Sequence, residues 1–441
     1  MRALPNDLAD DAATERLGRQ ALEQLQLQKL RAQLAPVLAD NPFYRAKLAA
    51  AGIEAATDIE ARADLTRLPF TTKQELSEDQ GAHPPYGTNC SLPPEAYTRL
   101  HQTSGTTGER LRWLDTPQSW SWWGRCWQAV FRGAGVSASD RVFFAFSFGP
   151  FIGFWSAYEG ASQLGAMAIT GGGMSSSQRL QAILANEATV LVCTPTYALH
   201  LAEVARKQNM DIAGSAVRTT IHAGEPGASV AGTKRKLERA WGARCFDPAG
   251  ATEVGAWGFE CEAQDGLHLN ESEFICEVLD PDTQQPCEEG ELVISNLNRW
   301  EMPVIRYRTG DRVRWHVEDT CSCGRTYRRL AGGVIGRLDD VLIIRGINVY
   351  PSAIEAVVRQ FDQIGEYAVQ VRRHGEMDEL AVRVELVDAD PTKAASLQEK
   401  LGQALQTNLG IRTPVELATS GELPRFELKA NRITDCRPGQ Q

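Results

Sequence analysis

The sequence lacks any long apolar run: no stretch of about 18 uninterrupted hydrophobic residues occurs among its 441 residues. Its first residues also lack the apolar core of a secretory signal, so we expect a cytoplasmic protein with no membrane association. Basic residues do not dominate, because 56 acidic and 46 basic side chains leave a formal charge of -10. This balance argues against non-specific binding to nucleic acid or to an anionic membrane face, and any anionic ligand needs a local site.

The chain also has few cysteines, ten among its 441 residues. That number is too small for a disulfide-stapled secreted scaffold, so in a reducing cytosol the cysteines are core residues or metal ligands. The remaining composition, 43% hydrophobic and 23% charged, is that of an ordinary globular protein. The length is about three times that of an average domain, which predicts two or three packed domains.

The hydrophobic pattern changes along the chain. The first hundred or so residues are predicted to be mostly helical, with an amphipathic helix over 15–35 that Pro36 stops. Between residues 140 and 295, short β-branched or aromatic runs alternate with helical stretches, which predicts a sheet with parallel strands covered by helices. Strands are expected at 142–146, 167–170, 190–192 and 219–222, and helices at 178–186 and 196–207.

Beyond Gly336 the pattern is that of a compact α+β unit. Strands are expected at 339–344, 367–372 and 380–386, and an amphipathic helix at 397–409. We therefore predict an α/β protein with a large N-terminal domain of mixed sheets flanked by helices and a small mobile α+β C-terminal domain. The predicted bounds are 1–338, with a helical part over 1–100, and 339–441.

One segment has the composition of a phosphate-binding loop. Residues 102–110 read Gln-Thr-Ser-Gly-Thr-Thr-Gly-Glu-Arg, where glycines let backbone amides turn toward an anion and hydroxyl groups supply further donors. The Lys-Ser/Thr ending of the P-loop is absent, and a solvated turn is the alternative. The candidate phosphate ligands are Thr103, Ser104, Gly105, Thr106, Thr107 and Gly108.

Further motifs follow in a fixed order: Asp-Pro-Ala-Gly-Ala-Thr-Glu at 247–253, Tyr-Arg-Thr-Gly-Asp at 307–311, Gly-Arg-Leu-Asp-Asp at 336–340 and Leu-Pro-Arg-Phe-Glu-Leu-Lys at 423–429. In this order they resemble the core motifs of the adenylate-forming superfamily of acyl-CoA synthetases, luciferases and peptide-synthetase adenylation domains. Within it the chain is most similar to the phenylacetate-CoA ligase branch, through its residues 41–45, 68–73, 194–197, 224–226 and 424–426.

The resemblance implies an enzyme that activates an aromatic carboxylic acid with ATP to an acyl-adenylate and then transfers the acyl group to CoA. Attack of one anion on another requires cations and oriented donors. The resemblance therefore places Lys429 beside the substrate carboxylate and the α-phosphate, Thr252 against phosphate, and Glu253 on Mg²⁺. Without the motif around it, Lys429 would be read as a surface lysine.

The resemblance also assigns the rest of the nucleotide site. Asp311 accepts hydrogen bonds from the ribose hydroxyls and Arg337 reaches ribose or phosphate, although Asp311 alone would be read as a turn residue. Asp339 is implied as the hinge whose rotation exchanges Lys429 for residues 346–348 between the two reactions. The alternative for Asp339 is a simple linking turn. The residues implied to border the adenine are Gly224, Glu225, Pro226 and Asp247.

Two departures from the family pattern leave alternatives open. Ala249 stands where relatives usually have an aromatic residue on the adenine, and Leu428 stands where glycine is usual. One alternative is an aryl-AMP ligase that passes the acyl group to an amine or to a carrier-protein thiol. Another is a non-catalytic nucleotide-binding relative, which the presence of Lys429, Glu253 and Asp311 argues against.

The acyl pocket is expected to be aromatic and apolar. Residues 143–155 contain six phenylalanines and a tryptophan, and Phe148 and Phe151 are the candidate substrate contacts, with the small residues Ala223, Gly250 and Ala251 leaving space for a flat ring. A buried strand is the competing interpretation of alternating aromatics. The four tryptophans within 120–127 are read as core or subunit contacts, and the resemblance implies a homodimer.

Three cysteines and one histidine form a candidate metal site: Cys261, His268, Cys321 and Cys323. Three thiolates and one imidazole suit a closed, structural Zn²⁺ centre, and Gly324 after the second cysteine of the 321–323 turn relieves crowding. The spacing matches no standard zinc-finger pattern, although the phenylacetate-type branch has similar positions. The alternative is four unlinked core residues.

Overall fold

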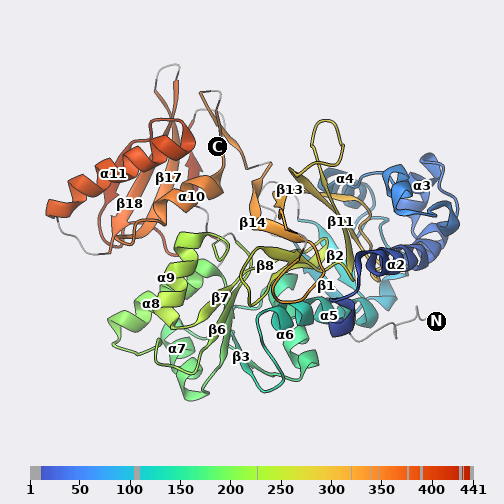
Figure 1. Ribbon diagram of the computed structural model, residues 1–441, viewed down its shortest axis with the longest axis horizontal. Coiled ribbons are helices and arrows are strands. Elements are labelled where there is room, and N and C mark those ends of the chain that lie inside the picture. The colour runs from blue at the N-terminus through green and yellow to red at the C-terminus, as the bar shows by residue number, and fades with distance from the viewer. Residues whose placement is uncertain are drawn as a thin grey trace.

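The computed structural model describes residues 11–103, 110–225, 227–318, 320–338, 340–345, 347–374, 377–387, 391–426, 430 and 432–437. Figure 1 shows a large N-terminal part with several sheets and flanking helices, and a smaller C-terminal part at the upper left. Most buried hydrophobic residues form one large cluster, whereas a separate cluster contains only residues from Ile344 onward. The predicted fold class, α/β with a small α+β C-terminal part, is confirmed.

The N-terminal part is helical up to the first strand, as predicted, but the long helix has different bounds. It begins at Arg19 and continues through Pro36. Leu34 and Val37 are fully buried on either side of the proline, so packing outweighs the backbone hydrogen bond that the proline removes. The helices are α1 (Asp11–Thr14), α2 (Arg19–Asp40), α3 (Pro42–Ala50) and α4 (Lys73–Ala82), with 3-10 turns at Ala56–Asp58, Arg62–Arg67 and Pro94–Ala96.

One sheet has five parallel strands, in the order β4-β3-β5-β6-β7. The predicted alternation of strands and helices is confirmed, although β3 ends two residues early because its pairing with β4 and β5 ends at Phe144. Its strands are β3 (Arg141–Phe144), β4 (Met167–Thr170), β5 (Val190–Cys193), β6 (Thr219–His222) and β7 (Arg244–Phe246). The helices between them are α6 (Ile152–Leu164), α7 (Ser176–Ala185), α8 (Pro195–Lys207) and α9 (Ala231–Trp241).

A seven-stranded antiparallel sheet lies beside the parallel one, in the order β11-β12-β13-β14-β10-β9-β8. Helix α5 (Pro117–Gly133) packs against β9 and α6, and its four predicted core tryptophans are buried. The strands are β8 (Pro248–Ala251), β9 (Gly255–Glu260), β10 (Leu267–Leu269), β11 (Phe274–Leu279), β12 (Glu289–Asn296), β13 (Tyr307–Trp315) and β14 (Arg329–Arg337). A separate hairpin pairs β1 (Arg99–Gln102) with β2 (Arg112–Asp115).

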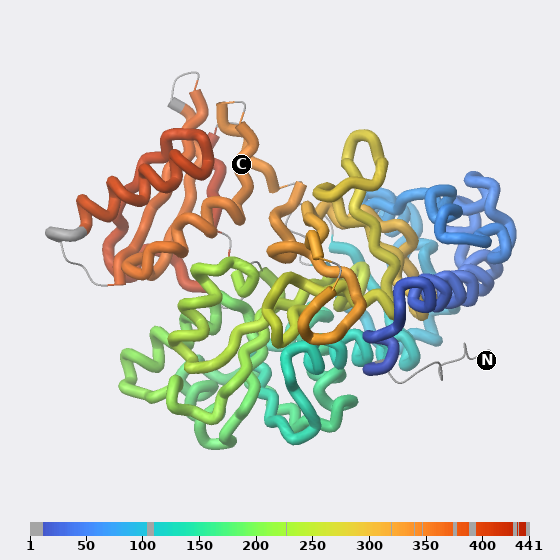
Figure 2. The backbone as a smooth tube through the Cα atoms, viewed as in Figure 1, coloured from blue at the N-terminus to red at the C-terminus, as the bar shows by residue number. Residues whose placement is uncertain are grey.

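The C-terminal part is built on a four-stranded sheet, β19-β18-β17-β20, in which the last strand pairs in parallel with β17. Figure 2 shows its orange and red segments grouped above the green α8–α9 region, and α10 packs against α9 and β14. No helix among the described residues is long and apolar enough to cross a membrane. The elements are β15 (Leu342–Ile344), β16 (Ile347–Val349), α10 (Pro351–Val358), β17 (Ile364–His374), β18 (Met377–Leu386), α11 (Pro391–Leu409), β19 (Val415–Ala418) and β20 (Ile433–Asp435).

Candidate functional site

The carboxyl ends of strands β5 and β6 carry two of the predicted motifs. Thr194 follows β5 and caps α8, because its side chain accepts a hydrogen bond from the Tyr197 backbone N–H and Pro195 occupies the first helical turn. Ala223 and Gly224 follow β6, and Gly224 has a φ of +97°, a conformation that favours glycine. Since parallel strands end at one edge of the sheet, these motifs meet where ligands bind in such folds.

Asp247 follows β7 at the same edge. Burial, followed by the nearby Glu260 carboxylate, raises the pKa of Asp247 to about 8. Lys234 opposes this shift only in part, because its Nζ is paired with Glu260 at 2.6 Å. The Asp247 carboxyl group is therefore largely protonated at neutral pH and donates as well as accepts hydrogen bonds.

The next turn carries the candidate magnesium ligand. Gly250 is exposed and Ala251 half-buried at the end of β8, Thr252 is half-buried, and Glu253 is 7% exposed. No described residue donates a hydrogen bond to the Glu253 carboxylate, whereas its backbone oxygen accepts one from Arg299 Nη1 at 3.2 Å. Mg²⁺ in proteins prefers carboxylate oxygens, so a buried carboxylate without a described donor fits that ion.

Asp311 and Arg337 lie directly opposite each other on β13 and β14. Arg337 Nη1 is 3.3 Å from Asp311 Oδ1, and the Asp311 backbone N–H donates to the Thr309 hydroxyl at 3.0 Å. Burial, and then the negative charge of Glu253, raise the pKa of the Tyr307 hydroxyl well above its usual range, and Arg337 and Asp311 also act on it. The charges of Glu253, Asp311 and Arg337 therefore all act on the same group, the Tyr307 hydroxyl.

The candidate phosphate loop joins strands β1 and β2. At its first residue, the Thr103 backbone N–H donates to the Leu111 carbonyl at 3.0 Å, and the Leu111 backbone N–H donates to Thr103 Oγ1 at 3.1 Å. These bonds close the neck of the hairpin, and Thr103 is buried. The predicted residues that lie outside the described ones are Ser104, Gly105, Thr106, Thr107, Gly108, Pro226, Asp339 and Lys429.

The C-terminal part contacts this edge of the parallel sheet through Glu225. Glu225 Oε1 accepts a hydrogen bond from the Thr196 backbone N–H at 2.9 Å, and its Oε2 accepts one from the Ala430 backbone N–H at 2.7 Å. Arg432 Nη2 donates to the Thr196 hydroxyl at 3.1 Å and pairs with Glu366 of β17. The residue that follows Lys429 in the chain therefore lies against the Gly224-Glu225 motif.

A second group of polar contacts joins the two parts further from this motif. Lys236 Nζ of α9 donates to the Phe361 and Ile364 carbonyls, both at 3.0 Å. Arg425 pairs with Glu385 at 2.6 Å inside the C-terminal part and lies 3.4 Å from Glu203 of α8. These bonds attach the C-terminal part to helices α8 and α9.

The aromatic run after β3 divides into two groups. Phe143 and Phe144 are fully buried on the strand, as the core interpretation expects, whereas Phe148 and Phe151 lie in the following turn and are half-buried. The Phe148 ring contacts the Trp155 ring edge to face at a centroid distance of 4.7 Å.

This aromatic cluster reaches the nucleotide motifs. Phe154 stacks on Phe146, and a Cβ atom at Gly224 would lie 3.7 Å from the Phe154 ring. The Gln102 backbone N–H donates to the Pro150 carbonyl at 3.0 Å, which ties the turn to the phosphate hairpin. The cluster therefore lies between the hairpin and Gly224.

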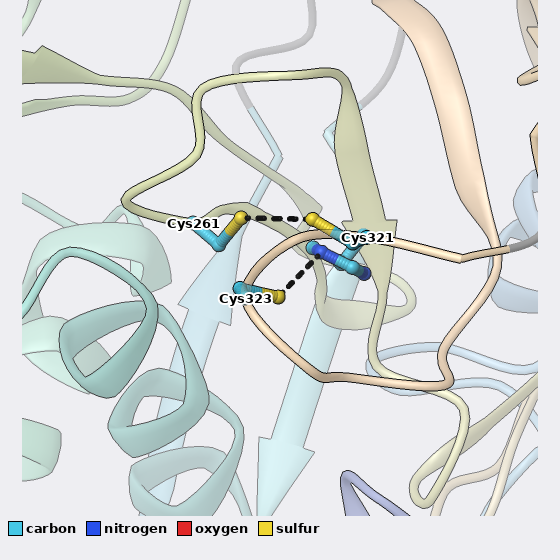
Figure 3. A group of neighbouring side chains, drawn as sticks. Cys261, Cys321 and Cys323 are labelled. Carbon is cyan, nitrogen blue, oxygen red and sulfur yellow. Dashed lines mark hydrogen bonds between the residues drawn. The ribbon is translucent and has the colours of Figure 1, made fainter.

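The four candidate metal ligands are brought together, which excludes the interpretation of four unlinked core residues. The ligand atoms of Cys261, His268, Cys321 and Cys323 all lie within 4.8 Å of one another. Figure 3 shows Cys261 facing Cys321 and Cys323, which come from a different loop. His268 Nδ1 lies 3.1 Å from the Tyr327 carbonyl, a contact typical of metal-bound histidines. The set suits a closed tetrahedral zinc centre.

The contacts of two residues at the site, Glu225 and Arg299, could not be read from the sequence. Glu225 is predicted to border the adenine, but both its oxygens accept backbone N–H groups, one of them from the C-terminal part. Arg299 is absent from the predicted site, although it is fully buried and contacts the Glu253 backbone. The local signal for Arg299 is limited to a charged residue in the segment between β12 and β13.

Comparisons with known proteins identify the family of the chain. Residues 346–437 match the AMP-binding enzyme C-terminal domain family. The chain is 33% identical to the phenylacetate-coenzyme A ligase of Escherichia coli (strain K12) over 428 residues, covering 94% of this chain and 95% of the relative.

Solved structures of 2-hydroxyisobutyryl-CoA ligase match over nearly the whole chain. The postadenylation state in complex with R3-HIB-AMP has a TM-score of 0.90 at 30% identity, covering 98% of this chain and 94% of the other. The thioesterification state, in complex with 2-HIB-AMP and CoA, has a TM-score of 0.72 at 31% identity, with coverages of 99% and 95%. The chain belongs to the phenylacetate-CoA ligase family of adenylate-forming, AMP-forming acid–CoA ligases.

Proposed function

We propose that this protein activates an aromatic carboxylic acid with ATP to an acyl-adenylate and pyrophosphate, and then transfers the acyl group to CoA with release of AMP. The observation that carries the proposal is the hydrogen bond from the Ala430 backbone N–H, next to Lys429, to Glu225 at the edge of the parallel sheet. The Asp311–Arg337 pair and Glu253, which all act on the Tyr307 hydroxyl, support it. The relatives that match over nearly the whole chain are acid–CoA ligases, which supports the same reaction.

In the adenylation step, the protein brings a carboxylate to the α-phosphorus of ATP and balances the negative charge that develops there. Lys429 would supply a mobile positive charge beside the attacking carboxylate. Glu253 would hold Mg²⁺, which neutralises phosphate charge when bound. Thr252 and the hydroxyl groups of residues 103–107 would donate to phosphate oxygens.

The remaining nucleotide contacts follow from donor and acceptor chemistry. The Asp311 carboxylate would accept from both ribose hydroxyls, and the neighbouring Arg337 guanidinium would steady it and reach the phosphate side. The residues Gly224, Pro226 and Asp247 would border the adenine, with a largely protonated Asp247 able to donate to a ring nitrogen and accept from the exocyclic amine. Ala249 leaves the adenine without the usual aromatic contact from this strand.

The acid is proposed to be aromatic because aromatic side chains cluster in the turn after β3. Phe148 and Phe151 are half-buried, Trp155 contacts Phe148, and the small Ala223, Gly250 and Ala251 would leave room for a flat ring. Aromatic side chains favour ring-shaped ligands through edge and face contacts. The relative crystallised with R3-HIB-AMP makes a small hydroxy acid the second candidate.

Two poses of the C-terminal domain are proposed, one for each reaction. The two states of the same relative match this chain with nearly equal coverage but with TM-scores of 0.90 and 0.72, so the difference between them lies in the arrangement of their parts. This supports a rotation about Asp339 of a small domain over 339–441 against a large domain over 1–338. Residues 346–348 would then replace Lys429 at the site, where the CoA thiol enters.

The Cys261, His268, Cys321 and Cys323 cluster is proposed to bind one structural Zn²⁺. Four ligands leave no open position for substrate, and His268 has the outer contact that fixes a metal-binding tautomer. The protein is further proposed to be a cytoplasmic homodimer. Size-exclusion chromatography with light scattering tests the oligomeric state, and cell fractionation tests the location.

The proposed reaction is tested by mixing purified protein with Mg-ATP and a panel of acids. Benzoate, phenylacetate and their hydroxy and amino derivatives, with 2-hydroxyisobutyrate as the aliphatic comparison, are assayed for pyrophosphate release with and without CoA. We expect pyrophosphate release with an aromatic acid, and CoA-dependent AMP release. Adenylate that CoA never consumes would point to an amine or carrier-protein acceptor, whereas silence across the whole panel would refute the proposal.

A further inference from the structure

A fully buried ion pair links the phosphate hairpin to the segment between β12 and β13. Asp115, the last residue of β2, and Arg299 both have side chains that are 0% exposed. Arg299 Nη2 and Nε donate to Asp115 Oδ1 at 3.0 and 3.2 Å, and Ser119 Oγ donates to the same oxygen at 2.9 Å. Because burying two charges is costly, such a pair needs either very good geometry or a role beyond stability.

Aromatic rings surround the guanidinium group of Arg299. Its central carbon lies 5.4 Å from the ring centroid of Trp113, 6.0 Å from that of Trp122 and 5.3 Å from that of Trp123. Indole faces attract a cation, and most strongly where water is excluded. The rings therefore hold the guanidinium plane in one place from several sides.

His101 is the other basic group that faces Asp115. Its Nδ1 lies 4.0 Å from Asp115 Oδ2, but burial lowers the pKa of His101 to about 4. The imidazole is therefore neutral at neutral pH, and Arg299 is the cation that balances the Asp115 charge.

The same guanidinium also reaches the candidate magnesium ligand. Arg299 Nη1, which Asp115 does not use, donates to the Glu253 carbonyl at 3.2 Å. The Arg299 backbone N–H is itself fixed, since it donates to Gln33 Oε1 at 3.0 Å. The planar guanidinium group thus bridges the Asp115 carboxylate, at the end of the phosphate hairpin, and the backbone of Glu253. A lysine ammonium on a flexible side chain cannot make both contacts in this geometry.

We propose that Arg299 is a positioning residue for the magnesium-binding carboxylate: Asp115 and the three indoles fix its guanidinium, and the guanidinium fixes the Glu253 backbone relative to the phosphate hairpin. This inference rests on the proposed function, because it assigns Glu253 to Mg²⁺. The pair couples the two halves of the nucleotide site, so that phosphate donors and metal ligand keep one spacing while the C-terminal domain moves.

The test compares Arg299→Lys and Asp115→Asn with the wild-type protein. Mg²⁺ is titrated into each protein at fixed ATP, and ATP binding is followed by calorimetry, with parallel titrations in EDTA. Mutating a residue that holds a metal ligand in place typically weakens metal binding by about 10–100-fold. We therefore expect the half-saturating Mg²⁺ concentration to rise at least about tenfold. ATP binding in EDTA and the KM for the acid should stay within about twofold.

Arg306→Lys is the matched control. Arg306 is also buried, pairs with a carboxylate (Glu277), donates to the Leu68 carbonyl at 2.8 Å and lies 4.1 Å from the Phe70 ring centroid. The hydrogen bonds of its guanidinium group go to Glu277, Thr66 and Leu68 and do not involve the Glu253 turn. Arg306→Lys should therefore lower the melting temperature without changing the Mg²⁺ requirement.

Two results would overturn the proposal. One is an unchanged Mg²⁺ requirement in both test variants, and the other is an equal rise in the Arg306→Lys control, because either shows that Arg299 contributes only to stability. If the Arg299→Lys variant does not fold, the near-isosteric Asp115→Asn variant tests the proposal. Because the readout is ATP binding, it still decides the role of Arg299 if no acid in the panel is turned over and the proposed reaction fails.

Discussion

Replacing Glu225 by glutamine should slow adenylation more than thioester formation. In the pose described here, the two carboxylate oxygens accept backbone N–H groups from Thr196 and from Ala430, at 2.9 and 2.7 Å. A glutamine keeps one acceptor oxygen and turns an NH₂ group toward the other donor. The variant therefore loses the bond to Thr196 or the bond to Ala430, the residue next to Lys429.

The size of this effect follows from the hydrogen bond that the substitution removes. A hydrogen bond to a charged group contributes about 1.5–3 kcal/mol, and solvent access to the half-buried Glu225 reduces this to about 1–2 kcal/mol. At about 1.4 kcal/mol for each factor of ten, adenylation should slow by about 5- to 30-fold. Glu203→Gln is the graded control, because its 3.4 Å contact with Arg425 involves a side chain that is 30% exposed and should matter by less than about fivefold.

The two half-reactions are measured separately. ATP–pyrophosphate exchange reports adenylation, and conversion of a synthetic acyl-adenylate with CoA reports thioester formation. If Glu225 acts through its hydrogen bond with Ala430, only the exchange rate falls, and the affinity for ATP stays within about twofold. An equal loss in both half-reactions, or a loss that follows ATP affinity alone, would refute this reasoning and return Glu225 to the adenine site.

Other expected outcomes test the remaining assignments. Lys429→Ala should lower pyrophosphate release by at least about a hundredfold while ATP still binds, and full activity in this variant would contradict the assignment of the lysine. Metal analysis of the purified protein should find about one zinc ion per chain, and Cys321→Ser should remove it and lower the melting temperature; a metal-free wild-type protein would contradict the zinc site. Burial raises the pKa of Asp247 to about 8, so its proton stabilises the folded state below about pH 4 and this stabilisation is lost as pH rises through 8. The melting temperature of Asp247→Asn minus that of the wild type should therefore grow between about pH 4 and 8 and level off above, and a flat difference would contradict the shift. Phe148→Ala should raise the KM for an aromatic acid and leave the KM for ATP unchanged, whereas equal changes in both would argue against an aryl pocket.

Local features of the fold could be predicted because they depend on residues close together in the chain. The helix expected at 196–207 is found at Pro195–Lys207, where Thr194 caps it through a contact that spans three residues. The four-residue strands β4 and β6 have the bounds that the sequence pattern predicted. Local signals failed at Pro36, where the helix continues because residues on either side are buried against distant segments. The end of β3 was missed because partner strands, and not its own composition, set where pairing stops.

At the candidate site, too, some features could be predicted from the sequence and others depend on the tertiary structure. The order of the motifs and their resemblance to known family motifs were enough to indicate an adenylate-forming ligase. The chemistry of thiolates and imidazole, together with that resemblance, was enough to select the four candidate cysteine and histidine ligands. That those four ligand atoms lie within 4.8 Å of one another was decided by the fold. So were the Glu225–Ala430 and Asp115–Arg299 hydrogen bonds, which join residues 205 and 184 positions apart. The physical reason is that a side chain's charge and shape are written in the sequence, whereas the partner that balances a buried charge is chosen only when distant segments pack together.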